Sequence, residues 1–183
     1  MKIATILPYK ENYTFCKAQA AAIWVSDFYK HSKFKNQTFI FGCTNTKDYL
    51  TKNYININIS NLKSKFTSTT KEYCNNLIKK IINNNFDIIE IHNRPEVFNL
   101  LKNTLNSKFV LYFHNDPLSM YGSKRASERL NLLIKLDKIV FISKWVRDRF
   151  FINIDKKLMD KTEVIYHSVN KVKKKNKKFK RIT

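Results

Sequence analysis

The chain has 183 residues, of which 43% are hydrophobic and 14% are aromatic, so it can bury a real core and is not an intrinsically disordered segment. Its formal net charge of +21 favours anionic partners, such as nucleic acid, anionic lipid headgroups or phosphorylated substrates. A compositional bias toward Lys, Asn and Ile offers a second explanation of this charge. No apolar stretch is long enough to span a bilayer, and the first residues lack the pattern of a signal peptide.

The basic residues are concentrated toward the C-terminal end. Residues 171–181 hold eight of the 35 Lys and Arg residues and no acidic residue, and the other 27 basic residues still exceed the 14 acidic residues by 13. We interpret residues 1–170 as one domain and residues 171–183 as a basic linker or tail. No sequence repeat divides the first part further.

The three cysteines, Cys16, Cys43 and Cys74, are odd in number and widely spaced. No metal-binding or redox pairing is visible among them, so we expect free thiols in a reducing compartment. This predicts a cytoplasmic protein, with a peripheral place on the inner face of the membrane as the alternative that the basic charge allows.

Short apolar runs alternate with amphipathic segments along the whole chain. The predicted strands are residues 2–7, 37–42, 54–59, 87–92, 108–113, 138–142 and 164–166. The predicted helices are residues 15–31, 69–82, 95–105, 124–136 and 144–151. The strict alternation of Ile and Asn in 54–59 indicates a strand nearer an edge. This order predicts an α/β fold, a doubly wound parallel sheet with helices on both faces.

Local signals fix several of the expected helix ends. Thr69 or Thr70 is expected to cap the helix 69–82, and the run of asparagines at 83–85 is expected to end it. Pro95 suits the first turn of the next helix, and Ser143 is expected to cap the helix 144–151.

Polar clusters follow five of the predicted strands. They are Tyr9-Lys10-Glu11, His92-Asn93-Arg94-Pro95-Glu96, His114-Asn115-Asp116, Ser143-Lys144 and His167-Ser168. If the sheet is parallel, all five lie along one edge, where open α/β sheets bind their ligands. Lys10, Arg94 and Lys144 would give this crevice cations that suit a phosphate or a carboxylate.

His114 is the best single candidate for chemistry, because Asp116 follows two residues later and could orient or charge it. Two structural explanations compete with this one. A histidine at a strand end is often only a hydrogen-bonded structural residue. Asn115 and Asp116 before Pro117 also fit an Asx turn.

Several other chemistries lack support in the sequence. With two glycines in the chain, neither a Gly-x-Gly-x-x-Gly loop nor a phosphate loop is present, and no nucleophile stands in a glycine-bounded elbow. We predict no metal site, because no helical His-x-x-x-His or Cys-x-x-Cys accompanies the histidines. The helix 144–151 interleaves basic and aromatic residues, and a core face formed by Trp145, Phe150 and Phe151 explains it more simply than nucleic-acid binding. The same helix could rest on an anionic membrane.

Taken together, these segments resemble the N-terminal half of glycosyltransferases of the two-Rossmann-domain type, family 4. Within that family, these segments are similar to the branch of enzymes that builds bacterial lipopolysaccharide or capsular polysaccharide. It is carried, in the family's order, by Met1–Pro8, Asp87–Glu96, Phe113–Leu118, Ser127–Arg129, Asp137–Val146 and Val164–Asn170.

The resemblance implies a Rossmann-like domain that holds the sugar acceptor, and transfer with retention and without a metal. It places His114 near the reacting sugar and phosphate, as the catalytic residue. The acceptor-binding residues that it implies are Tyr9, Lys10, Asn93, Arg94, Glu96, Asn115, Asp116, Arg125, Glu128, Arg129, Ser143 and Lys144.

Two departures from the family pattern bear on this expectation. The paired glycines that often follow the first strand are absent from residues 9–19. The sequence also stops where the linker to the donor domain would begin, so we expect no cofactor here and a nucleotide-sugar bound by a separate C-terminal domain. The expected function is the acceptor-binding half of a retaining transferase for a cell-envelope glycan or lipid-linked sugar acceptor. A fragment, half of a split enzyme, or a non-catalytic basic module for anionic membrane or nucleic acid are the alternatives, nucleic acid being the less favoured partner.

Overall fold

The computed structural model describes residues 1–59 and 68–167. The expected basic tail, residues 171–183, lies outside the described residues, and so does Ser168. The strands are β1 (Ile3–Ile6), β2 (Thr38–Gly42), β3 (Tyr54–Asn56), β4 (Ile88–His92), β5 (Lys108–Phe113), β6 (Lys138–Phe141) and β7 (Thr162–Val164). The helices are α1 (Ala20–His31), α2 (Thr69–Ile81), α3 (Pro95–Leu101), α4 (Ala126–Lys135) and α5 (Lys144–Phe150). Short 3-10 turns are η1 (Lys35–Gln37), η3 (Ile82–Asn84), η4 (Pro117–Ser119) and η5 (Lys156–Lys161).

In the described part of the chain the strands form one parallel sheet in the order β3-β2-β1-β4-β5-β6-β7. Because β1 lies inside the sheet, between β2 and β4, the chain winds first toward one edge and then toward the other, which confirms the doubly wound parallel fold. The strand β3 is the edge strand that its alternating sequence predicts.

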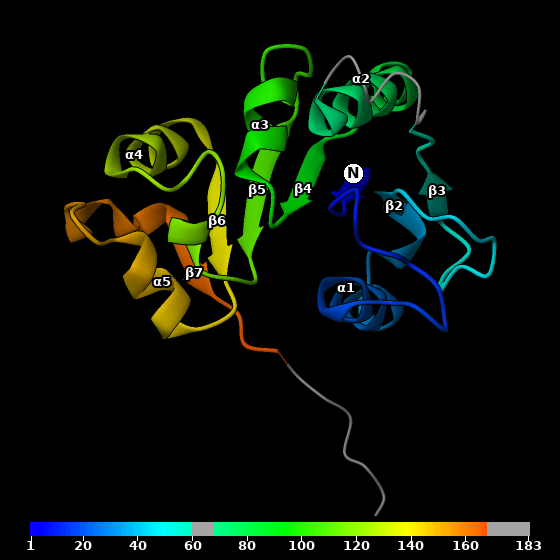
Figure 1. Cartoon of the computed structure of the whole chain (residues 1–183), viewed down its shortest axis with the longest axis horizontal. Coiled ribbons are helices and arrows are strands. Elements are labelled where there is room, and N and C mark those ends of the chain that lie inside the picture. The colour runs from blue at the N-terminus through cyan, green and yellow to red at the C-terminus, as the bar shows by residue number, and fades with distance from the viewer. Residues whose placement is uncertain (60–67, 168–183) are drawn as a thin grey trace, which may run out of the picture.

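The two faces of the sheet carry different helices (Figure 1). The helices α2, α3, α4 and α5 cover one face, and their apolar side chains join the strands in the larger hydrophobic cluster. The helix α1 covers the other face through Ala22 and Val25, which pack with Leu7, Ile40 and Tyr54. Alternate residues of β1 therefore belong to different layers, since Ala4 and Ile6 pack in the larger cluster while Ile3 and Thr5 face α1.

Some predicted boundaries are wrong, and long-range contacts explain most of the differences. The helix α1 begins at Ala20 rather than near residue 15, because Thr14 forms a bridge with Tyr49. The buried Glu11 then accepts a hydrogen bond from the Ala22 amide at 3.1 Å and caps the first turn. The strand β3 ends at Asn56 rather than residue 59, because β2, with which it pairs, ends at Gly42.

Other boundaries differ by a few residues. The helix α2 begins at Thr69 with Ser68 as its N-cap, so neither Thr69 nor Thr70 has the capping role expected of it. The left-handed Asn85 after η3 confirms that the asparagine run ends the helix. The helix α3 has Pro95 in its first turn as predicted but stops at Leu101, and β7 lies two residues earlier than predicted. The prediction placed this strand at the apolar residues 164–166. An edge strand such as β7 needs no continuous apolar sequence, so the apolar residues do not mark its position.

Candidate functional site

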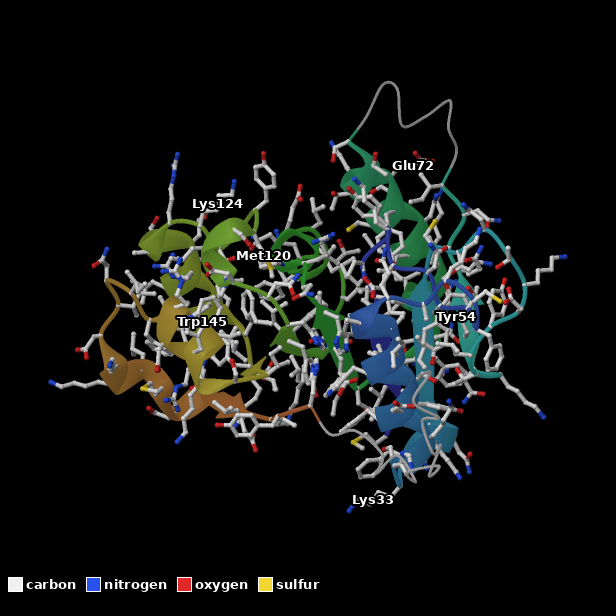
Figure 2. The ribbon with its side chains drawn as sticks, turned by 60° about the horizontal axis from the view of Figure 1, so that its bottom comes forward. Lys33, Tyr54, Glu72, Met120, Lys124 and Trp145 are labelled. Carbon is white, nitrogen blue, oxygen red and sulfur yellow. The ribbon has the colours of Figure 1, made fainter. Side chains whose placement is uncertain are left out.

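The carboxyl ends of the parallel strands bring several predicted site residues to one edge of the sheet. There, a pocket of about 380 Å³ is lined by Tyr9 after β1, by Asn93, Arg94, Pro95 and Glu96 after β4, and by Ser68, Thr70, Met120 and Tyr121. We call it the edge pocket. Figure 2 labels Met120, one of these lining residues, near the middle of the molecule. Four predicted residues, Tyr9, Asn93, Arg94 and Glu96, therefore meet in one cavity.

The edge pocket combines groups that recognise hydroxyls with a flat aromatic surface. The Arg94 guanidinium carbon lies 5.9 Å from the centre of the Tyr9 ring, and its Nη1 donates to the Asn93 carbonyl at 3.0 Å. Glu96 is half-buried beside it and supplies a carboxylate. Charged donors and acceptors of this kind, fixed at one site, suit a polar ligand such as a sugar.

Asn93 links the edge pocket to the strand behind it. Its backbone is left-handed, with φ of 53°, a conformation that asparagine tolerates better than most residues. Its backbone amide donates to the Tyr112 carbonyl at 2.8 Å, and its Oδ1 accepts from the His114 amide at 2.7 Å. The two strand ends, β4 and β5, are therefore tied together by one side chain.

Behind Asn93, three histidines form a continuous hydrogen-bonded row, which we call the histidine chain. His92 Nδ1 lies 2.8 Å from His114 Nε2, and His114 Nδ1 lies 3.2 Å from His167 Nε2. The indole of Trp24, from α1, packs against all three rings at centroid distances of 5.2 to 5.7 Å. The His92 ring also stacks on Tyr112 at 4.6 Å. The chain runs from a buried end at His92 to an exposed end at His167.

Burial keeps the histidine chain neutral. Desolvation lowers the pKa of His92 well below its ordinary value, and lowers that of His114 to about 4, with the neighbouring histidine adding to each shift. Desolvation also lowers the pKa of His167. A neutral imidazole has one donor and one acceptor nitrogen, so the protons in the row must all point the same way. Such a row can pass a proton from one end to the other.

Asp116 does not contact the His114 ring, so the expectation that it orients this histidine is wrong. Its Oδ1 accepts from the Leu118 amide at 3.0 Å, which is the Asx turn that the sequence offered as the alternative. Its Oδ2 accepts from Arg149 Nη2 at 2.8 Å and from Arg149 Nε at 3.1 Å. These bonds lower the pKa of Asp116. The carboxylate therefore joins η4 to α5.

The remaining predicted site residues lie outside the lining of the edge pocket. Lys10, Asn115 and Lys144 are exposed, and Ser143 caps α5 as predicted by accepting from the Val146 amide at 3.2 Å. At the start of α4, Glu128 accepts from the Arg125 amide at 2.9 Å.

Arg129 is buried with only 2% of its surface exposed. Its guanidinium donates to four backbone carbonyls, those of Phe150, Ile152, Ser123 and Lys124, at 2.6 to 3.0 Å. Its donors therefore hold the loop before α4 against the end of α5.

Three residues of this region were absent from the predicted catalytic and acceptor-binding residues. His92 and His167 were predicted only as members of the polar clusters at strand ends, without a role of their own. No feature of the sequence selects Trp24, because nothing in the spacing of α1 shows that its ring would reach the strand ends. All three cysteines are free, as predicted.

In the described ranges, no cluster of three or more potential metal ligands has the arrangement needed to hold an ion. Within the same residues, no helix is long and apolar enough to cross a membrane.

Comparisons with known proteins inform the fold. No protein-family profile matches the sequence, and no curated protein matches it. Among solved structures, a sucrose-phosphate synthase from Thermosynechococcus elongatus superposes with a TM-score of 0.61 at 10% identity, over 92% of this chain and 91% of that one. HepE of Anabaena, solved with UDP-glucose and with UDP, gives TM-scores of 0.59 and 0.56 at 10% and 12% identity.

The chain spans 45% of the length of HepE, while 93% of this chain is covered. Together with the strand order, these similarities show the Rossmann-like α/β fold that the sequence predicts. At such low identity they carry no further conclusion about the reaction.

Proposed function

We propose that this chain is the acceptor-binding half of a retaining glycosyltransferase, formed by one domain of residues 1–170. In the full system, a hexosyl unit would pass from a nucleotide-sugar to a cell-envelope glycan or a lipid-linked sugar, of the lipopolysaccharide or capsule type. The observation that carries this proposal is the edge pocket, where Tyr9, Asn93, Arg94 and Glu96 meet at the carboxyl edge of a parallel sheet. Two solved proteins with this fold support it, a sucrose-phosphate synthase and a UDP-glucose-bound HepE.

In this proposal the edge pocket holds the acceptor sugar. The Tyr9 ring would face the apolar side of the sugar, while Glu96 accepts from its hydroxyls and Arg94 donates to them. The nucleotide-sugar would bind to a further domain, and the two would meet over the strand ends. The metal-free transfer implied by the family resemblance is part of the proposal.

His114 would serve this reaction through the histidine chain. Both of its ring nitrogens are already bonded, to His92 and His167, and the imidazole is buried. The exposed member of the row is His167, so its Nδ1 would take up the proton released at the acceptor hydroxyl and later return it to solvent. While His167 carries this proton, its Nε2 donates to His114 Nδ1 and His114 Nε2 donates to His92 Nδ1, so the row would stabilise the imidazolium.

Replacing Arg94 with Ala tests the acceptor pocket. We expect the variant to bind sugars about 10-fold to 100-fold more weakly, because a charged hydrogen bond contributes about 1.5–3 kcal/mol. The measurement is an amide NMR titration of the whole chain with free hexoses and N-acetylhexosamines, in which the wild type should show shifts at Asn93, Arg94 and Glu96.

Lys108→Ala is the matched control, since it removes the same charge from the start of β5, at the opposite edge of the sheet. Equal sugar binding by the Arg94→Ala variant and the wild type would contradict the acceptor pocket. So would shifts at the same amides with UDP and none with any sugar.

The second candidate function is a non-catalytic module that rests on an anionic membrane. The helix α5 favours it, because Trp145 is 60% exposed there, which corrects the expectation that this ring joins the core. Figure 2 labels Trp145 on this helix. Lys144 is exposed beside it, and the Arg149 guanidinium lies 5.8 Å from the indole centre. An exposed indole among cations suits a headgroup surface.

Salt dependence separates this candidate from the acceptor pocket. If the charge drives binding, affinity for phosphatidylglycerol vesicles or duplex DNA should fall steeply between 50 and 200 mM salt, by about 10³-fold for six phosphate contacts on DNA. Removing residues 171–183, which carry eight basic residues, should nearly abolish DNA binding. Sugar binding in the edge pocket should survive both changes. Vesicle co-sedimentation measures the membrane binding, and the amide titration above measures the sugar binding. Salt-independent vesicle binding would contradict the charge-driven candidate.

A further inference from the structure

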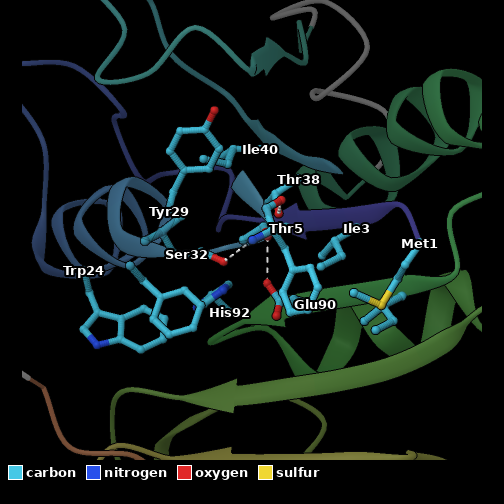
Figure 3. A pocket seen from close by; sticks show the side chains of 14 residues that line it. Met1, Ile3, Thr5, Trp24, Tyr29, Ser32, Thr38, Ile40, Glu90 and His92 are labelled. Carbon is cyan, nitrogen blue, oxygen red and sulfur yellow. Dashed lines mark hydrogen bonds between the residues drawn. The ribbon is translucent and has the colours of Figure 1, made fainter. Parts of the chain in front are cut away.

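A second cavity lies on the other face of the sheet, between α1 and the strands β1, β2 and β4. Its volume is about 220 Å³, and we call it the α1 cavity. The side chains of Trp24, Phe28, Tyr29 and Phe34 supply aromatic walls, and aliphatic side chains of the strands complete the lining. Figure 3 shows the cavity from close by, with Glu90 and His92 among its lining residues. None of its lining residues lines the edge pocket, and the inference below does not depend on the proposed transfer.

Two polar groups in this apolar wall are incompletely paired, the Glu90 carboxylate in charge and the His92 ring in hydrogen bonds. The Glu90 carboxylate accepts from the Thr5 hydroxyl at 2.7 Å and from the Tyr112 hydroxyl at 3.3 Å. Across residues 1–59 and 68–167, no cation forms an ion pair with it. His92 is 1% exposed, and its Nε2 has no hydrogen-bond partner among the same residues.

These features set an electrostatic requirement. A carboxylate in an apolar wall is costly unless a cation pairs with it, and burial accordingly raises the pKa of Glu90. Aromatic ring faces attract cations within about 6 Å, and the walls of the α1 cavity offer four aromatic side chains. The stacked pair of Trp24 and Phe28, with ring centres 5.1 Å apart, forms one of these walls.

We propose that the α1 cavity binds a small organic cation, a primary ammonium group carried on a short apolar or aromatic body. The ammonium has three donors and no acceptor, which matches the Glu90 carboxylate and the free Nε2 of His92. The size also agrees, because a cavity of about 150 Å³ holds benzene. A cavity of about 220 Å³ then has room for a ring and a short aminoalkyl arm.

Binding at this site fixes the direction of the histidine chain. An ammonium that donates to His92 Nε2 makes this atom the acceptor, so the proton of His92 lies on Nδ1 and is donated to His114. His114 then donates from Nδ1 to His167 Nε2. The occupied cavity therefore leaves the proton of His167 on Nδ1, at the exposed end of the row.

The test compares 2-phenylethylamine with 2-phenylethanol, a neutral ligand of the same shape, by calorimetric titration into the whole chain. We expect the amine to bind at least 10-fold more tightly, with intermolecular NOEs to Trp24 and Ile88. Glu90→Gln should remove this preference and leave the binding of the alcohol unchanged. Glu163→Gln, which removes the same charge on the exposed edge strand β7, should keep it.

Thr5→Val is a second variant, since it removes the hydroxyl that supports Glu90 but nearly keeps the side-chain shape. It should weaken amine binding several-fold and leave the alcohol unaffected, so the proposal stays testable even if Glu90→Gln fails to fold. Equal affinities of the amine and the alcohol for the wild type would overturn the proposal, because the cavity would then be only an apolar void. Absence of binding by the amine, or NOEs confined to other residues, would overturn it as well.

Discussion

Replacing Arg129 with Met should lower the free energy of unfolding by about 3–5 kcal/mol, the largest loss of stability that we expect from any single substitution at the predicted site residues. The guanidinium donates to four backbone carbonyls, of which the bonds to Phe150 and Ser123 are buried. Each buried carbonyl left without a donor costs about 1–3 kcal/mol, while water can reach the other two. Methionine keeps much of the volume but supplies no donor. Urea denaturation followed by circular dichroism measures the change.

Two further variants serve as controls for this result. Arg129→Lys should recover part of the loss, because an ammonium cannot reach all four carbonyls in the geometry of a guanidinium. Arg125→Met removes the same charge from the exposed residue before α4, and should cost less than about 0.5 kcal/mol. If Arg129→Met were as stable as the wild type but bound sugars poorly, Arg129 would belong to the acceptor site rather than to the fold.

The parts of the structure that depend on local patterns could be predicted from the sequence, and the position of Arg129 is not one of them. Strands whose apolar runs are buried on both faces were predicted well, and β5 has the predicted bounds, residues 108–113. Ser143 was predicted as a cap because its partner, the Val146 amide, lies three residues away. The parallel order then brought Tyr9, Asn93, Arg94 and Glu96 together, as the rule for strand ends requires.

What the sequence could not predict depends on contacts between distant segments. Glu11 lies nine residues before Ala20, the first residue of α1, so no local capping pattern identifies its bond to the Ala22 amide. His114 and His167 are 53 residues apart, and their bond depends on where β7 places the chain after it. The role of Arg129 depends in part on the carbonyls of Phe150 and Ile152, which are 21 and 23 residues away, and the same positive charge would have served a ligand equally well. Residue type alone could not separate these two roles.

The second large effect concerns catalysis. Replacing His114 with Ala should reduce sugar transfer by about 10²–10⁴-fold when the chain is combined with a donor domain, the range that one acid–base residue contributes. His114 is the sole link between His92 and His167 in the histidine chain, and Ala interrupts this row. The fold should remain intact, because the bond from the His114 amide to Asn93 does not involve the imidazole. The measurement is transfer rate at saturating acceptor, with near-UV circular dichroism to check the structure.

His167→Ala distinguishes direct catalysis by His114 from action through the row. If the proton enters at the exposed His167, the two single variants should lose similar amounts of activity, and the double variant should lose no more than either one. A loss that is additive in free energy would mean that His114 acts without His167. Asn106→Ala, at an exposed site near the amino edge of the sheet, is the control and should transfer sugar at the wild-type rate. Wild-type turnover in His114→Ala would remove this histidine from the mechanism, and the row of imidazoles would then serve only the packing around Trp24.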